Sequence, residues 1–317
     1  MLAGFNTMSK SIPSAALRRY SWLTTFYFVL VILWGTVVRA TGSGNGCGEH
    51  WPLCGGAWFP GAMILARTIE FAHRATSGLS GIAVLVLLVW CWCSTARAHL
   101  ARWSALAAAI LTLNEGLVGA LLVLWGKTAG DQSPARTFLL TTHMTNTLLM
   151  VAALALTAHL LSRDTGFTWK TIQLHQPLRN LAGLAVIVFT CTAGAVAALG
   201  DTLFPATNLT QALIDDFSVT SNWLLRYRWT HPALALVAAA YVIRLLLQAL
   251  RSKGSAENRP LVTTISYLLA LQFLLGILDA VLLAPIWLQV THLVCADSLW
   301  IVLVVLVARL TLIPKEI

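Results

Sequence analysis

The chain has 317 residues, of which 58% are hydrophobic and 10% are charged, and its mean hydropathy is +0.77. This apolar fraction is well above that of a soluble globular domain and indicates a membrane protein. The net charge of +9 requires no nucleic-acid partner, because anionic lipid at the cytoplasmic face of a membrane attracts basic loops.

Eight apolar runs follow one another along the chain, each near the length of about 20 residues that a transmembrane helix needs. The first run is not followed by a small-residue cleavage site, so we interpret it as a helix and not as a signal peptide. The pattern predicts an all-α, polytopic membrane protein. Its helices are expected at approximately 20–38, 67–93, 103–125, 137–161, 178–199, 223–250, 261–283 and 286–312.

Lysine and arginine are distributed unevenly between the two sides of this arrangement. Fourteen of them fall on the side that holds both termini, and seven fall on the other side. By the positive-inside rule, both termini are predicted to be cytoplasmic. We therefore expect a multi-pass protein of a bacterial-type cell membrane, or of the inner mitochondrial membrane if the source is eukaryotic.

Four histidines fall on alternate predicted helices, the second, fourth, sixth and eighth. They are His73, His143, His231 and His292. Because each half of the chain has an even number of helices, both halves enter the membrane in the same sense, which predicts two four-helix bundles related by a pseudo-two-fold axis. The charged segment at 163–177 is the expected boundary, and it divides the chain into units 1–165 and 166–317.

The depth of these histidines favours a metal or cofactor site. At a rise of about 1.5 Å per residue, they lie about 9–10 Å inside the membrane on the side away from the cytoplasm. Ionisable side chains at such depth are costly and usually functional. Two facing imidazoles can bind a planar haem, whereas zinc requires four clustered ligands. Bis-histidine haem is therefore favoured over other metals.

Glu70 lies three residues before His73, on the same face of a helix. The position three residues before His231 holds Arg228, so the two halves are expected to have different roles. A carboxylate beside a porphyrin could accept a proton or stabilise a cation during oxidation of a substituent. Glu70 could equally pair with a nearby arginine such as Arg74, and the residues alone leave these two roles open.

Cys47 and Cys54 lie seven residues apart in a glycine-rich loop on the outer side. A disulfide is favoured, because disulfides persist on the oxidising side and glycine lets the backbone bend without steric cost. Metal binding by these cysteines and His50 is the alternative. Other intramembrane polar residues either line a proton or water path or satisfy one another. They are Asn114, Glu115, Asp279 and Asp297.

Three motifs in the first half are distinctive. They are Gly35-Thr36-Val37-Val38-Arg39-Ala40-Thr41-Gly42-Ser43-Gly44, then Cys47 with Trp51-Pro52-Leu53-Cys54, and Glu70-Phe71-Ala72-His73-Arg74. With the eight helices, the four histidines and the two-half repeat, the chain resembles the haem A synthase family over essentially its whole length. In the second half the resemblance is carried mainly by the helices with His231 and His292.

This resemblance implies an oxidoreductase that oxidises the C8 methyl group of haem O to a formyl group by successive hydroxylation, giving haem A for terminal oxidases. It implies that His231 and His292 bind a resident haem b cofactor, and that His73 and His143 bracket the haem O substrate. Glu70 would take part in the chemistry. Haem O synthase and an electron-transfer protein are the expected partners, besides the lipid bilayer, and homo-oligomerisation is left open.

The resemblance also implies that Cys47 and Cys54 form a loop disulfide connected with electron or substrate transfer. Arg39 and Arg74 could pair with haem propionates, because a guanidinium group suits bidentate contact with a carboxylate. They could instead be interface arginines that extend their charge toward water.

Two other functions fit parts of the pattern. A di-haem electron-transfer protein of the membrane cytochrome b type would explain the four histidines, but it leaves Glu70 without a role. A secondary transporter with a parallel repeat would explain the symmetry and the buried acids, but the broken helices typical of such sites are not evident.

Overall fold

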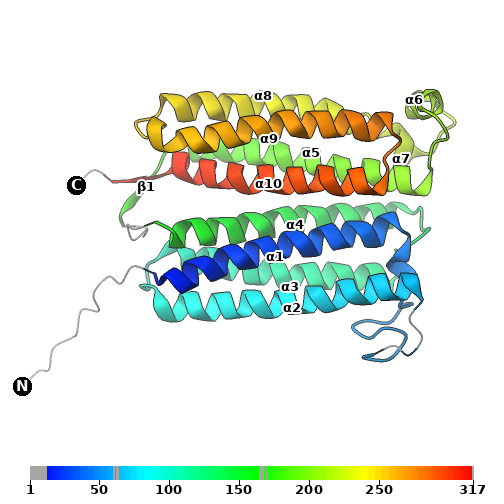
Figure 1. Cartoon of the computed structure of the whole chain (residues 1–317), viewed down its shortest axis with the longest axis horizontal. Coiled ribbons are helices and arrows are strands. Elements are labelled where there is room, and N and C mark those ends of the chain that lie inside the picture. Colours follow the sequence, from blue (N-terminus) through cyan, green and yellow to red (C-terminus); the bar gives the residue numbers. More distant parts are fainter. Residues whose placement is uncertain (1–12, 60, 62–63, 164–167, 169, 316–317) are drawn as a thin grey trace, which may run out of the picture.

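The computed structural model describes residues 13–59, 61, 64–163, 168 and 170–315. This part of the chain contains eight helical segments that are long and apolar enough to cross a membrane, which confirms the predicted all-α, multi-pass fold. In chain order they are α1 (Ala15–Ala40), α2 (Leu65–Ser94), α3 (Leu100–Leu124), α4 (Pro134–Leu161), α5 (Pro177–Leu203), α7 (Trp223–Arg226) with α8 (Thr230–Arg251), α9 (Ser255–Val281) and α10 (Ile286–Thr311) (Figure 1).

Four shorter elements join or cap these helices. They are the 3-10 turn η1 (Ser43–Asn45), helix α6 (Leu209–Phe217), and strands β1 (Ile172–Leu174) and β2 (Leu312–Pro314). The two strands pair antiparallel, with Ile172 opposite Pro314. This pairing ties the connection between the two halves of the chain to the segment after α10. Neither the strands nor α6 are predicted from hydropathy.

Helix ends follow local capping chemistry. The Ser14 side chain accepts a hydrogen bond from the Leu17 N–H at 3.2 Å and starts α1. Ser133 caps α4, and Pro134 follows it at the first helical position, where a missing N–H costs nothing. These residues therefore set where the membrane helices begin.

A continuous helix is predicted over 223–250, whereas the structure ends α7 and starts α8 after a short turn. Pro232 lies in the first turn of α8. It has no N–H to donate, and in a continuous helix its ring would clash with the carbonyl group of Arg228. The His231 N–H instead donates to that carbonyl at 3.1 Å. The break therefore places His231 in the first turn of α8.

The helices form two adjacent groups, α1–α4 and α5 with α8–α10 (Figure 1). Helices α4 and α10 are the most buried, and they meet between the groups, where the Trp300 indole donates to the Leu148 carbonyl at 2.8 Å. Leu148 and Trp300 belong to one apolar core with Leu245 of α8 and Ile265 of α9. The pseudo-two-fold relation and the division into units 1–165 and 166–317 stay predictions.

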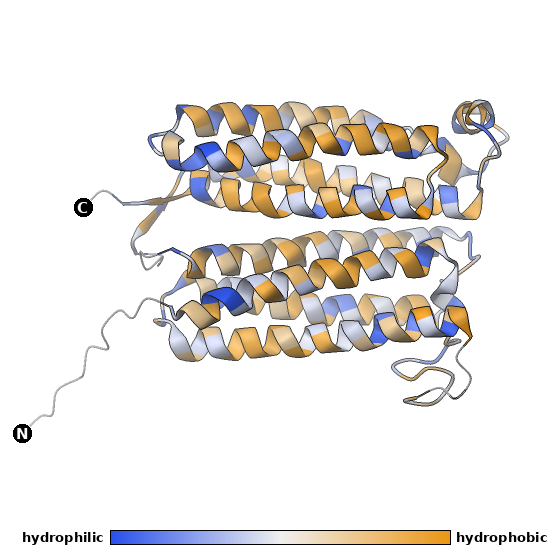
Figure 2. Ribbon diagram, viewed as in Figure 1, coloured by the Kyte–Doolittle hydropathy of each residue, from blue (hydrophilic) through white to orange (hydrophobic). Residues whose placement is uncertain are grey.

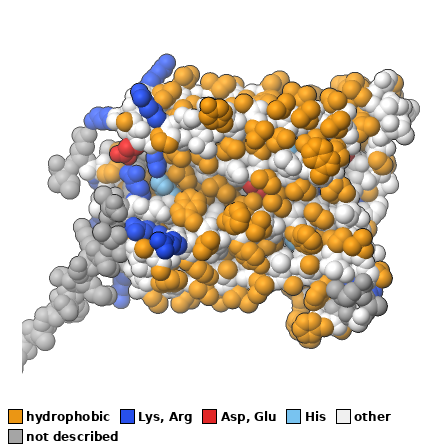
Figure 3. Space-filling view, viewed as in Figure 1, with side chains coloured by type: hydrophobic (Ala, Val, Ile, Leu, Met, Phe, Trp, Pro, Cys, Tyr) orange, Lys and Arg blue, Asp and Glu red, His pale blue; other side chains and the backbone are white. Residues whose placement is uncertain are grey.

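The long sides of the molecule are apolar. Figure 2 shows hydrophobic residues along all the membrane-length helices, and Figure 3 shows Lys and Arg side chains gathered near the end where both termini lie. Large hydrophobic side chains such as Leu113, Phe189 and Tyr267 are exposed in mid-helix. A surface of this kind is stable only against lipid, so the protein is an integral multi-pass membrane protein.

Candidate functional site

The structure brings His231 of α8 and His292 of α10 together inside the second helix group. Their ring centroids are 6.4 Å apart and the ring planes are inclined by 83°. Two imidazoles on opposite sides of one metal ion, each with a metal–nitrogen distance of about 2 Å, place their centroids about 6 Å apart. The observed spacing therefore fits the two axial ligands of one haem iron.

His73 of α2 and His143 of α4 lie in the first helix group, near enough to each other for their charges to interact. Both side chains are half-buried. The four predicted histidines are thus distributed as two pairs, one in each group of helices.

Each of the four imidazoles packs against a glycine on the preceding membrane helix. The pairs are Gly35 with His73, Gly119 with His143, Gly194 with His231 and Gly276 with His292. A Cβ atom added at Gly194 would lie 2.9 Å from Cε1 of its histidine, and the corresponding distances at Gly35 and Gly276 are 3.1 Å. A methyl group at these three positions would crowd the ring, so glycine leaves the space that the imidazole occupies. At Gly119 the distance is 3.9 Å, an ordinary contact.

Three of the imidazoles also contact a polar group that lies four residues before the packing glycine. Glu115 Oε1 lies 3.4 Å from His143 Nδ1, the Thr190 carbonyl oxygen lies 3.0 Å from His231 Nδ1, and Gln272 Nε2 lies 3.1 Å from His292 Nε2. The corresponding position on α1 holds Val31. Among the described residues, Nδ1 of His73 is buried without a hydrogen-bond partner, as is Nδ1 of His143 and of His292.

A polar contact on one imidazole nitrogen sets the tautomer and leaves the other nitrogen for a metal. The contact between Thr190 and His231 has this form. The placement of a polar residue four positions before the packing glycine was not predicted from the sequence. The spacings Glu115-x-x-x-Gly119 and Gln272-x-x-x-Gly276 repeat in corresponding helices and could have indicated it.

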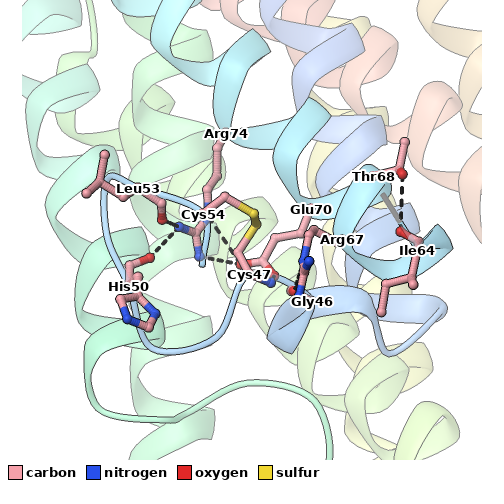
Figure 4. Close-up of a disulfide and its surroundings, with 10 residues drawn as sticks. All are labelled: Gly46, Cys47, His50, Leu53, Cys54, Ile64, Arg67, Thr68, Glu70 and Arg74. Atoms are coloured by element: carbon pink, nitrogen blue, oxygen red, sulfur yellow. Dashed lines mark hydrogen bonds and ion pairs between the residues drawn. A yellow bond between two sulfur atoms is a disulfide. The ribbon is translucent and has the colours of Figure 1, made fainter. Parts of the chain in front are cut away.

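Glu70 is 3% exposed and both of its carboxylate oxygens are bound by the protein. Oε2 accepts a hydrogen bond from the Cys47 N–H at 2.8 Å, and Oε1 forms an ion pair with Arg74 at 2.5 Å. Arg74 also donates to the carbonyl groups of His50 and Leu53 (Figure 4). The pairing with arginine that the sequence left open is therefore present, and it attaches the loop that contains Cys47 and His50 to α2.

Cys47 and Cys54 form a disulfide with a Cα–Cα distance of 4.4 Å, as predicted. The alternative of a metal bound by these cysteines and His50 is therefore excluded in this state. Among the described residues, no cluster of three or more His, Cys, Asp or Glu side chains could hold a metal ion without a porphyrin.

Arg39, the other proposed propionate contact, lies between the two helix groups. Its guanidinium group donates to the Ala198 carbonyl at 2.8 Å, to Thr202 Oγ1 at 2.6 Å and to Gln289 Oε1 at 2.7 Å. It thereby joins α1 to α5 and α10. Contact of Arg39 or Arg74 with propionates stays a prediction.

The other intramembrane polar residues fall into two sets. Asn114 donates to Asn146 at 2.8 Å, and Asn146 donates to Glu115 at 2.6 Å, so these residues satisfy one another as one alternative predicted. Asp279 and Asp297 each have a buried carboxylate oxygen without a partner among the described residues.

A further ion-pair cluster, at the end of the helices opposite the two termini, was not predicted. Arg228 binds Asp201 and Asp216 there at 2.7 Å each. Arg228 is 27 residues from Asp201 and 12 residues from Asp216, and the three lie on different elements or loops, so helical periodicity does not indicate that they meet.

Comparisons with known proteins agree with this arrangement. The chain is 39% identical over 290 residues to a protoheme IX farnesyltransferase of Thermus thermophilus. The aligned residues make up 92% of this chain and 48% of that protein. It is 28% identical to the heme A synthases of Geobacillus kaustophilus, over 78% of this chain and 75% of that protein, and of Staphylococcus epidermidis, over 82% of each. The chain thus spans about half the length of the Thermus relative.

The COX15-CtaA family model, described as a cytochrome oxidase assembly protein, matches residues 18–64 and 65–304. This match includes the disulfide loop, Glu70 and all four histidines. The chain therefore belongs to the COX15-CtaA family of cytochrome oxidase assembly proteins, the haem A synthase family that its motifs resemble.

Proposed function

We propose that this protein is a haem A synthase, which oxidises the C8 methyl group of haem O to the formyl group of haem A. The observation that carries the proposal is the pair of imidazoles of His231 and His292, 6.4 Å apart, together with a second histidine pair in the other helix group beside a buried glutamate. Membership of the haem A synthase family supports the same activity.

The second helix group is the proposed site of a resident haem b. The imidazole spacing suits two axial ligands, Gly194 and Gly276 leave room for the rings, and Thr190 orients His231. Haem held by two histidines supplies reversible one-electron transfer. The residues of this group position the rings and keep them in an apolar, water-poor environment.

The first helix group is the proposed site of the haem O substrate, between His73 and His143. Two successive hydroxylations of the methyl carbon give a gem-diol, which loses water to form the aldehyde. The carbon loses four electrons and gains two oxygen atoms. With water as the oxygen source, an electron-transfer partner must accept four electrons, whereas with dioxygen as the source it must supply two electrons for each hydroxylation. Glu70, one turn before His73, would stabilise positive charge that develops near the methyl group or accept its proton.

Glu70 can have this role because its environment holds it in place. The ion pair with Arg74 and the hydrogen bond from Cys47 orient both oxygens. The second half has Arg228 at the matching position, and that arginine is bound by Asp201 and Asp216. We therefore assign the porphyrin chemistry to the first half.

A haem O synthase is the proposed supplier of the substrate. The Thermus relative is named a protoheme IX farnesyltransferase, and this chain matches 48% of its length. Farnesyl transfer to protohaem is the class of reaction that yields a farnesylated haem. We also propose that both termini are cytoplasmic, which is supported by the Lys and Arg side chains near the end that holds them (Figure 3).

The substitution Glu70→Gln tests the proposal in cells that supply haem O and make no haem A of their own. We expect haem A to be lost while haem b stays bound, because the amide keeps the size of the side chain but not its charge. Chromatography of the extracted haems measures both. Glu257→Gln, which changes an exposed acid at the opposite end, is the matched control.

The outcome separates the alternatives. Unchanged haem A in Glu70→Gln would favour a di-haem electron-transfer protein without porphyrin chemistry. A colourless wild-type preparation would argue against both haem functions and favour a transporter.

A further inference from the structure

Glu115 is an acid inside the membrane whose surroundings connect it to one of the proposed haem ligands. Its Oε2 accepts a hydrogen bond from Asn146 Nδ2 at 2.6 Å, and its Oε1 accepts one from the Thr147 hydroxyl. The same Oε1 lies 3.4 Å from Nδ1 of His143. All three partners are on α4, so the carboxylate of α3 is anchored beside the imidazole by its neighbours.

The four imidazoles differ in the residue that lies four positions before the glycine against which each of them packs. In the second half it offers neutral groups, the Thr190 carbonyl and the Gln272 amide. In the first half this position places the Glu115 carboxylate near His143, whereas on α1 it holds the apolar Val31. Nδ1 of His73 and Nδ1 of His143 both lack a hydrogen bond among the described residues, so the two histidines differ in the nearby carboxylate. The two ligands of the proposed substrate site are therefore unequal.

A carboxylate near one imidazole nitrogen orients the ring and makes the other nitrogen a stronger metal ligand. The 3.4 Å contact between Glu115 and His143 is longer than a charge-assisted hydrogen bond and lacks hydrogen-bond geometry. Glu115 therefore biases the ring through its charge and position. An imidazole without such a carboxylate lacks this gain in ligand strength and binds the metal less firmly.

We propose that Glu115 is a positioning residue that makes His143 the firm axial ligand of the substrate haem, and that His73 is the ligand released when substrate and product exchange. A resident cofactor needs two firm ligands, whereas a substrate haem must enter and leave. The inference rests on the proposed function, in that haem O lies between these two histidines.

The test measures haem release and does not depend on turnover. Purified protein carrying haem b and loaded with haem O is mixed with excess apomyoglobin, and chromatography of the haems remaining follows each type. Loss of an outer-shell partner typically weakens metal binding about 10–100-fold. We expect Glu115→Val to release haem O at least about tenfold faster than wild type, and Glu115→Gln to fall between them.

Val31→Gln is the matched gain-of-contact variant, because its amide oxygen can accept from Nδ1 of His73 at the position from which the Thr190 carbonyl contacts Nδ1 of His231. It should slow the release of haem O. Retention of haem b in every variant reports that the fold is intact. Wild-type release rates in both Glu115 variants, or in Val31→Gln, would overturn the inference. Failure of wild type to bind haem O would instead overturn the proposed function.

A separate observation concerns the end of the molecule that holds both termini. A cavity of about 690 Å³ lies there between α4 and the second helix group. The described residues that line it include one acid, Glu257, and the basic residues Arg163, Arg179, Arg244, Arg251, Lys253 and Arg309. Leucines of α4, α8 and α10 form an apolar part of the wall. Figure 3 shows basic side chains gathered at this end.

Among the described residues, Arg179, Arg244 and Arg251 form no ion pair with an acid, so no described acid neutralises their positive charge. Glu257 is 73% exposed in its side chain and lies 3.8 Å from Arg163. Arg244 donates to the neutral Gln248 at 3.1 Å, and Arg309 donates to the Glu257 carbonyl at 3.0 Å. A cavity with excess cations and an apolar wall at the level of the lipid headgroups suits an anion that carries acyl chains.

We infer that this cavity binds the headgroup of an anionic phospholipid. Nanodiscs of phosphatidylcholine, with or without phosphatidylglycerol, test this by native mass spectrometry after detergent extraction and by thermal unfolding. We expect wild type to retain phosphatidylglycerol and to unfold at a higher temperature when it is present. Arg179→Gln with Arg244→Gln should lose both effects.

The matched control is Arg97→Gln with Arg259→Gln, which removes two exposed arginines outside the cavity. This variant should behave as wild type. If both double variants lose lipid retention and stabilisation equally, the effect depends on net charge and not on the cavity, which would overturn the inference. Equal stabilisation by inorganic phosphate in phosphatidylcholine nanodiscs would assign the cavity to a free anion and would also overturn it.

Discussion

At the scale of single residues, the packing of each histidine against a glycine determines how much room an imidazole has. Gly194 is the tightest of the four positions, where an added Cβ would lie 2.9 Å from His231 Cε1, and Gly119 is the loosest, at 3.9 Å from His143 Cε1. Since side chains in a packed interior respond to a single methyl group, these two glycines should tolerate alanine differently.

Gly194→Ala is therefore expected to displace the His231 ring and to reduce haem b content or change its visible spectrum. Overpacking of this kind costs about 1–3 kcal/mol. Gly119→Ala is the control, and it should be neutral or slightly stabilising because alanine is the better helix former. Haem content per purified chain and the visible spectrum measure the difference. Identical behaviour of the two variants would contradict the steric argument.

At the scale of elements, the connection between α2 and α3 depends on His99. Its Nδ1 accepts a hydrogen bond from the Ala101 N–H at 3.1 Å, which caps α3. The side chain is 5% exposed. Burial lowers the pKa of His99 below its ordinary value of 6.5, and the nearby Arg102 lowers it further. The imidazole is thus held neutral in the folded state.

This shift predicts a pH dependence of stability. The unfolded chain binds a proton at His99 more readily than the folded chain, so the contribution of His99 is complete above pH 6.5 and is lost as the pH falls below it. Thermal unfolding in detergent between about pH 8 and about pH 5, the range over which histidine titrates, checks this. His99→Asn keeps a capping oxygen without titrating and should flatten the dependence. An unchanged slope would refute the assignment.

At the scale of the whole molecule, Arg39 holds the two helix groups together near the end opposite the two termini (Figure 1). Its three hydrogen bonds reach Ala198 and Thr202 of α5 and Gln289 of α10. A single side chain of α1 therefore connects helices that are distant in the chain, as the separation of 159 residues between Arg39 and Ala198 shows.

Arg39→Met should lower the free energy of unfolding by several kcal/mol, and with it the unfolding temperature, since each hydrogen bond to a charged group contributes about 1.5–3 kcal/mol. Arg39→Lys keeps the charge but not the planar guanidinium group with its several N–H donors, so its stability should lie between those of wild type and Arg39→Met. Arg19→Met, on an exposed part of α1, is the control. Thermal unfolding in detergent measures all three, and a wild-type midpoint for Arg39→Met would contradict the bridging role.

The sequence by itself determined the eight helices, because spanning a bilayer requires long apolar segments and this requirement is local. It also predicted which histidines lie on the long apolar helices, and it favoured the disulfide of Cys47 with Cys54, which the structure confirms. Pro232 marks where the predicted helix over 223–250 breaks, but hydropathy does not detect the break.

Only the tertiary structure decided what surrounds each histidine. The contacts of Glu115 with His143 and of Gln272 with His292 join residues on different helices, and their distances depend on how the helices rotate and pack. The same holds for Arg39 between the two helix groups. Periodicity indicates which residues share a helix face, whereas the choice of neighbour depends on packing along the whole chain.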